Sequence, residues 1–355
     1  MKSVLRRFKS MVRRAMHYVD GQLIRAGAKN RRMAVFYYIL RGRFSREQQS
    51  VLAGKLAYKQ SLHDPSIHFS LLRRNVHRLE KGMLMRPRRV PFGLNYIAET
   101  VDAYAKAVRA GIERNELAWA HDVLSEYMNI TPEHPAIEPL REVVRHCSDA
   151  THASPLSTDM ESARIPYRRL DSDAPNIAYE EFLRLTRYRR SVRWYLQQKV
   201  PRELIDNAIE AAAYSPTACN RLPYEFRIFD DPALVERAIR LPMGTSGFSH
   251  QVPAVAVVVG KQRYYFNERD RHLIYIDGSL AIMSFVYALE VQGLASCCIN
   301  WPDVEDLEQK MASFLGLADD ERPIMLVAFG YPDPSGMVAN STKKPLSSLR
   351  TYNFE

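Results

Sequence analysis

The six residues Ala254–Val259 are the feature that most restricts the fold of this chain. They read Ala-Val-Ala-Val-Val-Val and contain no polar side chain. Successive side chains of a strand point to opposite faces of a sheet, so such a run is typical of a strand that is covered on both faces. We therefore expect a central strand with a layer of structure on each side.

Further strands and helices are predicted around that strand. We expect strands at 225–229, 295–300 and 324–329, and helices at 179–187, 203–213 and 277–293. Pro201 lies at the start of the second helix, where its missing N–H is not needed, and the third helix is apolar enough to be buried. Helices and strands do not alternate strictly, so we expect an α+β fold in which helices sandwich a mixed sheet.

The part of the chain before this sheet is expected to be mainly helical. Ser45 and Gln48 have the spacing of a capping box, and residues 95–110 and 115–130 read as two helices that turn at Gly111. Residues rich in Ser, Thr, Asp and Pro then show no sustained period and read as a linker. The expected division is an N-terminal arm at 1–44, a helical domain at 45–147, a linker at 148–177 and a C-terminal domain at 178–355.

The N-terminal arm carries the positive charge of the chain. The first 60 residues hold fifteen Lys and Arg against Asp20 and Glu47, a net charge of +13, so the rest of the chain carries −3 of the total of +10. Residues 1–20 are predicted to form a short basic amphipathic helix. It can lie on an anionic membrane surface, or it can pack on the body with a solvated basic face. Binding to nucleic acid is a further option, but the segment lacks the interleaved aromatic and basic residues of a known nucleic-acid-binding module.

Two further observations concern compartment and burial. Residues 34–40 are apolar and are expected to be buried against the domain or a partner. Four cysteines without a Cys-x-x-Cys or metal-ligand spacing indicate reduced thiols, and no apolar run approaches the roughly 20 residues of a membrane span. We expect a cytoplasmic protein, or one peripheral to the inner face of the membrane if the arm binds lipid.

Several common enzyme classes lack their sequence signatures here. No Gly-x-Gly-x-x-Gly follows a predicted strand, because Gly244-Thr245-Ser246-Gly247 has the wrong spacing, so a Rossmann dinucleotide site is not supported. There is also no phosphate-binding Walker loop and no Gly-x-Ser-x-Gly. His77 and Glu80 are three residues apart, but they lack a third ligand, and a surface ion pair is the better interpretation. No metal site is expected.

The segment Arg189-Arg190-Ser191-Val192-Arg193 has the chemistry of a phosphate grip. Three guanidinium groups and a serine hydroxyl occur within five residues, and a guanidinium offers a planar fork of donors that matches phosphate oxygens. A solvated basic helix end is the alternative. Downstream, two prolines and small polar residues between Tyr214 and Tyr224 predict an irregular loop with unused backbone groups.

Four motifs of the C-terminal half occur in one order. They are Arg-Arg-Ser-Val-Arg at 189–193, Ser-Pro-Thr-Ala-Cys-Asn-Arg-Leu-Pro at 215–223, Gly-Leu-Ala-Ser-Cys-Cys-Ile-Asn at 293–300, and Ala-Phe-Gly-Tyr-Pro at 328–332 followed by Lys-Lys-Pro at 343–345. Together they make residues 178–350 resemble the FMN-dependent nitroreductase family. The resemblance implies a nitroreductase-like α+β homodimer with FMN in clefts at the subunit interface.

The resemblance also implies roles for individual residues. Arg189, Arg190, Ser191 and Arg193 would hold the phosphate and ribityl chain, and Lys343 would add a second cation to the phosphate. Pro216, Thr217 and Ala218 would lie along the flavin ring, and Asn220 would form a hydrogen bond to its side. The backbone amides of Asn300 and Trp301 would approach the N5 edge of the ring. No catalytic side chain is expected, because the flavin carries the chemistry.

Some positions depart from the family pattern. Leu222 stands where the family often has Gln, and Tyr224 where it often has Trp. Asn300 and Trp301 replace residues that are often small, so Trp301 either narrows the pocket or is a core or interface aromatic. Residues 71–96, which hold a second basic cluster of unassigned contacts at 73–89, look like an extension found on nitroreductase-like proteins of bacterial surface-polysaccharide gene clusters.

The expected function is that of an FMN oxidoreductase. Electrons would pass from NAD(P)H through FMN to a small organic acceptor, and a polysaccharide-related biosynthetic intermediate is one option. The alternative is a flavin-fold scaffold without turnover, held at a membrane surface by residues 1–40. The sequence leaves the acceptor and the preference between NADH and NADPH open.

Overall fold

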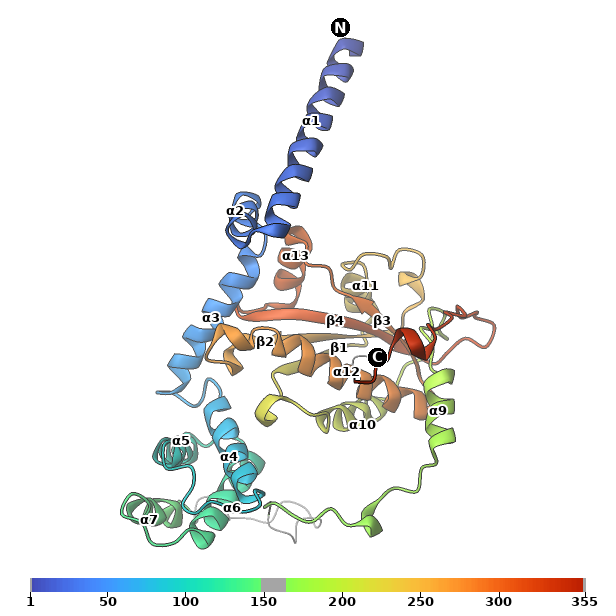
Figure 1. Ribbon diagram of the computed structural model, residues 1–355. Coiled ribbons are helices and arrows are strands. Elements are labelled where there is room, and N and C mark those ends of the chain that lie inside the picture. The colour runs from blue at the N-terminus through green and yellow to red at the C-terminus, as the bar shows by residue number, and fades with distance from the viewer. Residues whose placement is uncertain (1, 148–163, 354–355) are drawn as a thin grey trace. The chain divides into compact units, whose positions relative to one another are not determined.

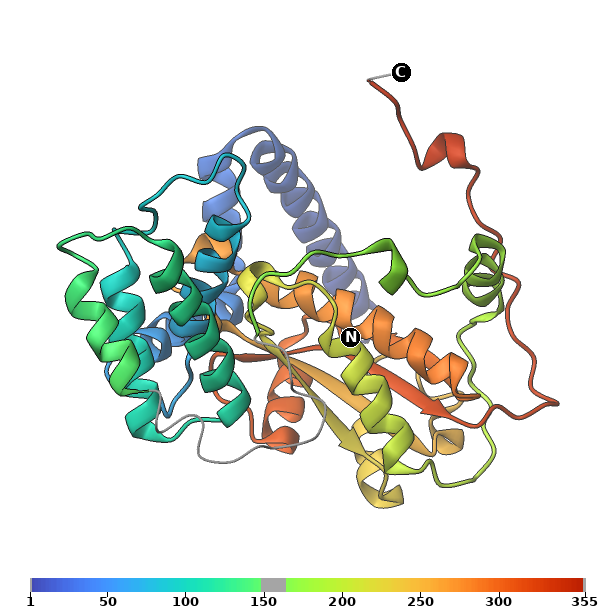
Figure 2. The same ribbon diagram turned by 90° about the horizontal axis from the view of Figure 1, so that it is seen from below.

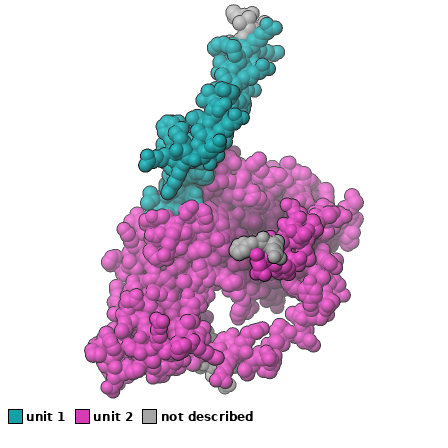
Figure 3. Space-filling model, in the orientation of Figure 1, with its two compact units in different colours: residues 1–52 teal, residues 53–355 magenta. Residues whose placement is uncertain are grey.

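The computed structural model describes residues 2–147 and 164–353, and the chain divides into two compact units, Met1–Leu52 and Ala53–Glu355 (Figures 1 and 3). The finer division into arm, helical domain, linker and C-terminal domain stays a prediction. Residues 148–163 of the expected linker lie outside the described residues.

The first unit is built on a helical hairpin. Helix α1 runs from Lys2 to Lys29, and α2 from Arg31 to Arg41. The side chain of Asn30 accepts hydrogen bonds from the amides of Arg32 and Met33, which caps α2. Asp20 of α1 accepts a hydrogen bond from the Tyr37 hydroxyl at 2.9 Å and pairs with Arg41. The basic helix expected at 1–20 is therefore longer than predicted, since it continues to the Asn30 cap.

Helix α2 corrects the expectation for residues 34–40. No residue of α2 is buried. Only Met33, Ala34 and Tyr37 are half-buried, because they occupy the one face that meets α1. The opposite face is apolar and 51–71% exposed, and it consists of Val35, Phe36, Ile39 and Leu40. The structure thus gives no residue of this segment full burial, and the expected burial against a partner stays a prediction.

A group of helices with its own core precedes the sheet. Its helices are α4 (Ser70–Met83), α5 (Ile97–Ala110), α6 (Arg114–Ile130) and α7 (Glu138–His146), and α3 (Ser45–Ser61) comes before them in the chain. Leu79, Val101, Tyr104, Leu124 and Tyr127 are buried in this core. The predicted pair of helices around Gly111 is confirmed, since Gly111 ends α5 at a φ of 63°, which favours glycine.

The sheet has four strands in the order β1-β2-β4-β3. They are β1 (Tyr224–Phe229), β2 (Ala254–Lys261), β3 (Ala295–Asn300) and β4 (Glu321–Gly330). The pairings between them are antiparallel, and an isolated parallel bridge joins Ser191 to Ser296 at the β3 edge. Strand β2 is central and almost wholly buried, as its sequence predicted.

Helices cover both faces of this sheet. On one face lie α10 (Arg202–Ala213) and α12 (Leu273–Val291), side by side in Figure 2, and on the other α11 (Pro232–Ile239) and α13 (Glu305–Leu315), as Figure 1 shows. Side chains of β2 alternate between the two cores, so Val258 packs with α10 and α12 while Val257 packs with α11 and α13. The expected α+β sandwich is confirmed.

Helix α12 is apolar on all sides but buried on one. By length and composition alone, Glu268–Val291 is the one helical segment of the described residues that could cross a membrane, and 44% of its most apolar stretch is buried inside the fold. The core helix of a soluble protein can have the same length and composition. Its buried residues pack against the sheet, as expected, but Ile276, Leu280, Met283 and Val291 are exposed.

Candidate functional site

The arginine segment lies along the open edge of β3. Helix α9 (Tyr179–Tyr188) ends directly before Arg189. The amide of Val192 then donates to the carbonyl of Ser296 at 3.0 Å, and the hydroxyl of buried Tyr195 donates to the carbonyls of Val192 and Ala328. The sheet therefore fixes the backbone that carries the three guanidinium groups.

Within the residues that the structure describes, the three guanidinium groups have no carboxylate ion pair. Arg189 and Arg190 are half-buried and Arg193 is exposed. Arg190 donates to the carbonyl of Asn340 at 2.5 Å, and Arg193 lies over the ring of Phe248, 5.7 Å from its centre. Each guanidinium group has five N–H donors. The contacts of Arg190 and Arg193 use few of them, so most of the donors stay available to an external anion.

The thiol of Cys297 shows that these groups act on one region. Cys297 is buried on β3, and burial raises the pKa of its thiol. The charges of Arg193 and Arg189 and a hydrogen bond from Ser191 oppose that rise in pKa. Arg189, Ser191 and Arg193 therefore all lie within electrostatic reach of Cys297. Three of the predicted phosphate ligands therefore influence the same buried thiol on β3.

Lys343 lies on the C-terminal tail. Its side chain is exposed, and the tail is tied to the arginine segment through the bond from Arg190 to Asn340, three residues earlier. The tail thus starts beside the arginine segment. Whether the Lys343 ammonium reaches the same anion stays a prediction.

The loop before β1 has the irregular backbone that its sequence predicted. Cys219, Asn220 and Leu222 have φ angles of 56°, 50° and 48°, in the left-handed region that costs most residues free energy. The loop is fixed by hydrogen bonds from the amide of Leu222 to the Thr217 hydroxyl at 3.2 Å and between the hydroxyls of Ser215 and Ser284 at 2.7 Å.

Buried Asp277 on α12 anchors the same loop. Its carboxylate accepts a hydrogen bond from the amide of Ala218 at 3.0 Å and another from the Tyr265 hydroxyl at 2.9 Å. Burial raises the pKa of Asp277, and these two bonds and the charge of Arg221 oppose the rise. Sequence reasoning did not find Asp277. The signal was present, because a single acid inside a long apolar helix needs buried partners.

Arg73 of α4 supports the loop from the helical region. Its Nε donates to the carbonyl of Asn220 at 2.7 Å, and its guanidinium also pairs with Glu116 of α6 and lies over the Trp119 ring. Arg73 belongs to the basic cluster whose contacts the sequence left unassigned. The structure therefore links that cluster to a predicted flavin contact.

Asn300 is the last residue of β3 and Trp301 follows it, on the same edge strand that Ser191 joins at Ser296. Trp301 is 8% exposed, packs in the core beneath α11 and α13, and donates its indole N–H to Glu308 at 2.7 Å. The two interpretations of Trp301 were a side chain that narrows the pocket and a core or interface aromatic. The structure places Trp301 in the core of its own chain. Asn300 pairs with Met325 of β4. The role of their backbone amides stays a prediction.

The two parts of the predicted site lie at opposite ends of the sheet. Ser191 adjoins Ser296, whose β4 partner is Phe329, whereas the loop enters β1 at Tyr224, which aligns through Gly260 with Arg322 of β4. Seven residues of β4 separate Phe329 from Arg322, a distance of about 23 Å at about 3.3 Å per residue. One chain alone does not bring the arginine segment and the loop together.

A comparison with family models now identifies the region that contains both parts. A model described as the nitroreductase family matches residues 186–244 and 235–331. These residues, less than half of the chain, match the nitroreductase family. The matched nitroreductase residues include Arg189–Arg193, the loop before β1 and the whole sheet. The nitroreductase-like α+β fold expected from the four motifs is thereby confirmed, as is the helical region before it.

Individual relatives are distant. The chain is 24% identical over 198 residues to iodotyrosine deiodinase 1 of Sus scrofa, which covers 48% of this chain and 68% of that protein. It is 24% identical over 153 residues to a protein of Methanothermobacter thermautotrophicus whose name proposes an NADH dehydrogenase/NAD(P)H nitroreductase, with 43% of this chain and 78% of that protein covered. A solved FMN-dependent nitroreductase of Clostridium difficile shares 19% identity and a TM-score of 0.42 over 48% of this chain and 98% of its own.

Proposed function

We propose that the protein is an FMN-dependent oxidoreductase of the nitroreductase family. One observation carries the proposal most directly. Three guanidinium groups without a carboxylate partner among the described residues, and the Ser191 hydroxyl beside them, are held at one sheet edge by Tyr195 and Val192. A phosphate dianion is the ligand that such a donor set fits.

FMN carries a phosphate group that this set of donors would bind. Its phosphate would be bound by Arg189, Ser191 and Arg193, with Arg190 and Lys343 on the adjoining tail. When bound, FMN supplies hydride and electron transfer itself. The residues of this chain then need only bind and orient it, and no acid–base pair of side chains is required.

The proposed site takes its second part from a second copy of the chain. The start of β1 at Tyr224, which this loop leads into, lies about 23 Å from the arginine segment along the sheet at about 3.3 Å per residue, so a homodimer would complete the site with the partner's loop. The exposed face of α12 supports a dimer, because helices that are apolar on all sides are normally buried. Its residues Ile276, Leu280 and Met283 are 37–52% exposed in the single chain.

The electron donor that we propose is NAD(P)H, and the acceptor is a small organic molecule. The names of two relatives, a deiodinase of iodotyrosine and an NAD(P)H nitroreductase, describe reactions on small molecules and support this class of acceptor. A biosynthetic intermediate of polysaccharide assembly is one candidate within that class.

An absorption spectrum of the purified chain tests the proposal. We expect bound flavin that is bleached by NAD(P)H without oxygen, and a variant with Arg189→Ala and Arg193→Ala that retains FMN at least tenfold less tightly. Arg145→Ala on α7, whose side chain is 72% exposed, is the matched control. A colourless protein that added FMN does not reconstitute would refute the proposal. Bound FMN without NAD(P)H oxidation by any common acceptor would favour the scaffold without turnover.

A further inference from the structure

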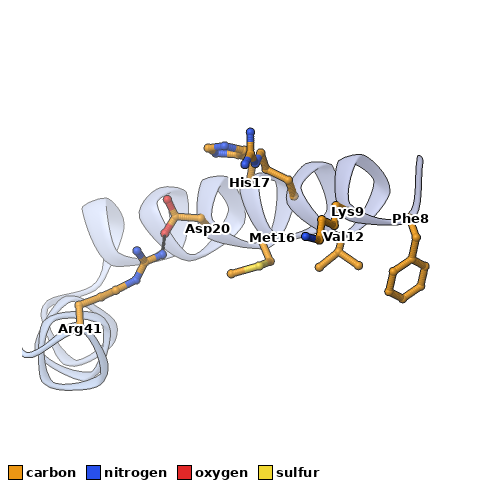
Figure 4. A pocket seen from close by; sticks show the side chains of 8 residues that line it. Phe8, Lys9, Val12, Met16, His17, Asp20 and Arg41 are labelled. Atoms are coloured by element: carbon orange, nitrogen blue, oxygen red, sulfur yellow. Dashed lines mark hydrogen bonds and ion pairs between the residues drawn. The ribbon is translucent and has the colours of Figure 1, made fainter. Parts of the chain in front are cut away.

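The hairpin of α1 and α2 presents apolar side chains that nothing in its unit covers. On α1, Phe8, Val12 and Met16 point to one side of the helix, and His17 points to the other (Figure 4). Phe8, Val12, Met16 and Val19 are 39–68% exposed. On α2, the outer face of Val35, Phe36, Ile39 and Leu40 is also exposed. A soluble protein rarely leaves two such faces in water without a binding role.

The same hairpin is strongly basic. Residues 1–52 hold thirteen Lys and Arg against Asp20 and Glu47, a net charge of +11. Asp20, the acidic residue of α1, is paired with Arg41 and accepts a hydrogen bond from Tyr37, so the net positive charge is carried by the other basic side chains. At a helical spacing of about 100° per residue, several exposed basic residues of α1 fall on the far side of the helix from its apolar row. They are Arg6, Arg7 and Arg14.

Exposed apolar rows combined with a high positive charge are the chemistry of a helix that lies in the surface of an anionic bilayer. A second copy of residues 1–52 would place +11 against +11, which disfavours self-association. A nucleic acid would use the positive charge, but it would leave Phe8, Phe36 and Ile39 in water. We propose that the α1–α2 hairpin docks the protein on an anionic membrane surface, with the apolar faces in the lipid and the basic side chains at the headgroups.

The proposal is independent of the flavin site, so its test does not depend on FMN. The full chain is mixed with vesicles of phosphatidylcholine alone, or with 30% phosphatidylglycerol, and the bound fraction is measured by flotation. We expect binding to the anionic vesicles at low salt, at least tenfold weaker binding to neutral vesicles, and release at high salt.

Two variants with matched controls separate the charge from the apolar contribution. Arg13→Gln with Arg14→Gln should lower the partition into anionic vesicles about 30-fold, because each basic residue contributes about fivefold. Arg168→Gln with Arg169→Gln, an exposed arginine pair outside the hairpin, should leave it unchanged. Phe36→Ser with Ile39→Ser should lower it at least tenfold, and the control is Tyr167→Ser with Leu170→Ser, which are 86% and 53% exposed.

The variants are also examined without vesicles by circular dichroism and sedimentation velocity. Unchanged helix content with reduced flotation supports the proposal. Equal binding to neutral and anionic vesicles overturns it, and so does full vesicle binding by both variants. If Phe36→Ser with Ile39→Ser instead changes the oligomeric state, the face is a protein interface and the proposal fails. Binding to a 30-base-pair duplex without binding to vesicles would assign the charge to nucleic acid and overturn it as well.

Discussion

At the scale of single residues, the contacts that fix the candidate site join residues far apart in the sequence. The arginines were found from the sequence because they are neighbours in it. Arg73 and Asp277 were not found as contacts of the loop, since 147 residues separate Arg73 from Asn220 and 59 separate Asp277 from Ala218. Local spacing contains no information about such pairs. The core position of Trp301 likewise depends on Glu308 of the following helix.

Arg73→Ala tests the support that the helical region gives to the loop. We expect FMN retention about tenfold weaker, because the loss of a charge-assisted hydrogen bond to the Asn220 carbonyl amounts to roughly 1.5 kcal/mol. Arg89→Ala, in the same basic cluster but exposed, is the control. The measurement is the FMN dissociation constant by fluorescence quenching. Equal affinities for both variants would show that the loop holds its conformation without Arg73.

His68→Phe tests a buried titratable contact. His68 is buried, its Nδ1 accepts from the amide of Ser70, and its ring stacks on Tyr264 with centres 5.7 Å apart. Burial, together with the charge of Arg263, lowers its pKa to about 4 against the opposing charge of Asp320. The unfolded chain binds a proton near pH 6.5, so the stability contribution is complete above that pH and is lost as pH falls from about 6.5 toward 4.

The expected result follows from that window. Between pH 7.5 and 5 the wild-type chain should lose about 2 kcal/mol more stability than His68→Phe, since each pKa unit corresponds to about 1.4 kcal/mol. Urea unfolding at both pH values measures the difference. An identical loss in the two proteins would mean that His68 titrates normally in the folded state.

At the scale of helices and strands, the sequence predicted most elements of the C-terminal half. The strands at 225–229 and 254–259 lie within β1 and β2. Residues 254–259 are a continuous apolar run, and residues 225–229 alternate polar and apolar side chains up to Ile228, and short segments of either kind favour strands. Three elements were less predictable. Helix α1 continues to Lys29, before the local cap at Asn30, which the sequence reading missed. The contact of α4 with the loop and the exposure of α2 depend on tertiary packing rather than on the local pattern.

Gly54→Ala tests the packing of α3 on the segment after β2. An added Cβ would lie 2.6 Å from Cβ and 2.7 Å from the carbonyl carbon of Gln262, so a methyl group cannot be accommodated without a backbone shift. Alanine favours a helix by about 1 kcal/mol over glycine, yet we expect net destabilisation of about 1–3 kcal/mol from overpacking. Gly21→Ala, with no atom within 4 Å of its added Cβ, should be neutral or stabilising. Thermal unfolding of both variants provides the comparison, and a stabilised Gly54→Ala would disprove the close contact.

At the scale of the whole molecule, the proposed flavin site requires a homodimer. Leu280 lies in the exposed apolar face of α12 and is 44% exposed in the single chain. Leu280→Asp should therefore convert a dimer of 40.9 kDa chains into monomers and remove bound FMN together with it. Sedimentation equilibrium with simultaneous detection of flavin absorbance measures both quantities. Leu170→Asp, 53% exposed outside α12, should change neither, and monomers that keep full FMN would contradict a shared site.

A mixing experiment between two defective variants gives the most decisive test of that shared site. One variant carries Arg189→Ala and Arg193→Ala, and the other carries Asn220→Ala and Pro216→Gly, so neither should retain FMN as a homodimer. If each site combines the arginines of one chain with the loop of the other, refolded mixtures contain heterodimers with one intact site. Equal mixing should then restore FMN to a quarter of all sites. Absence of any restored FMN in confirmed heterodimers would contradict the shared site.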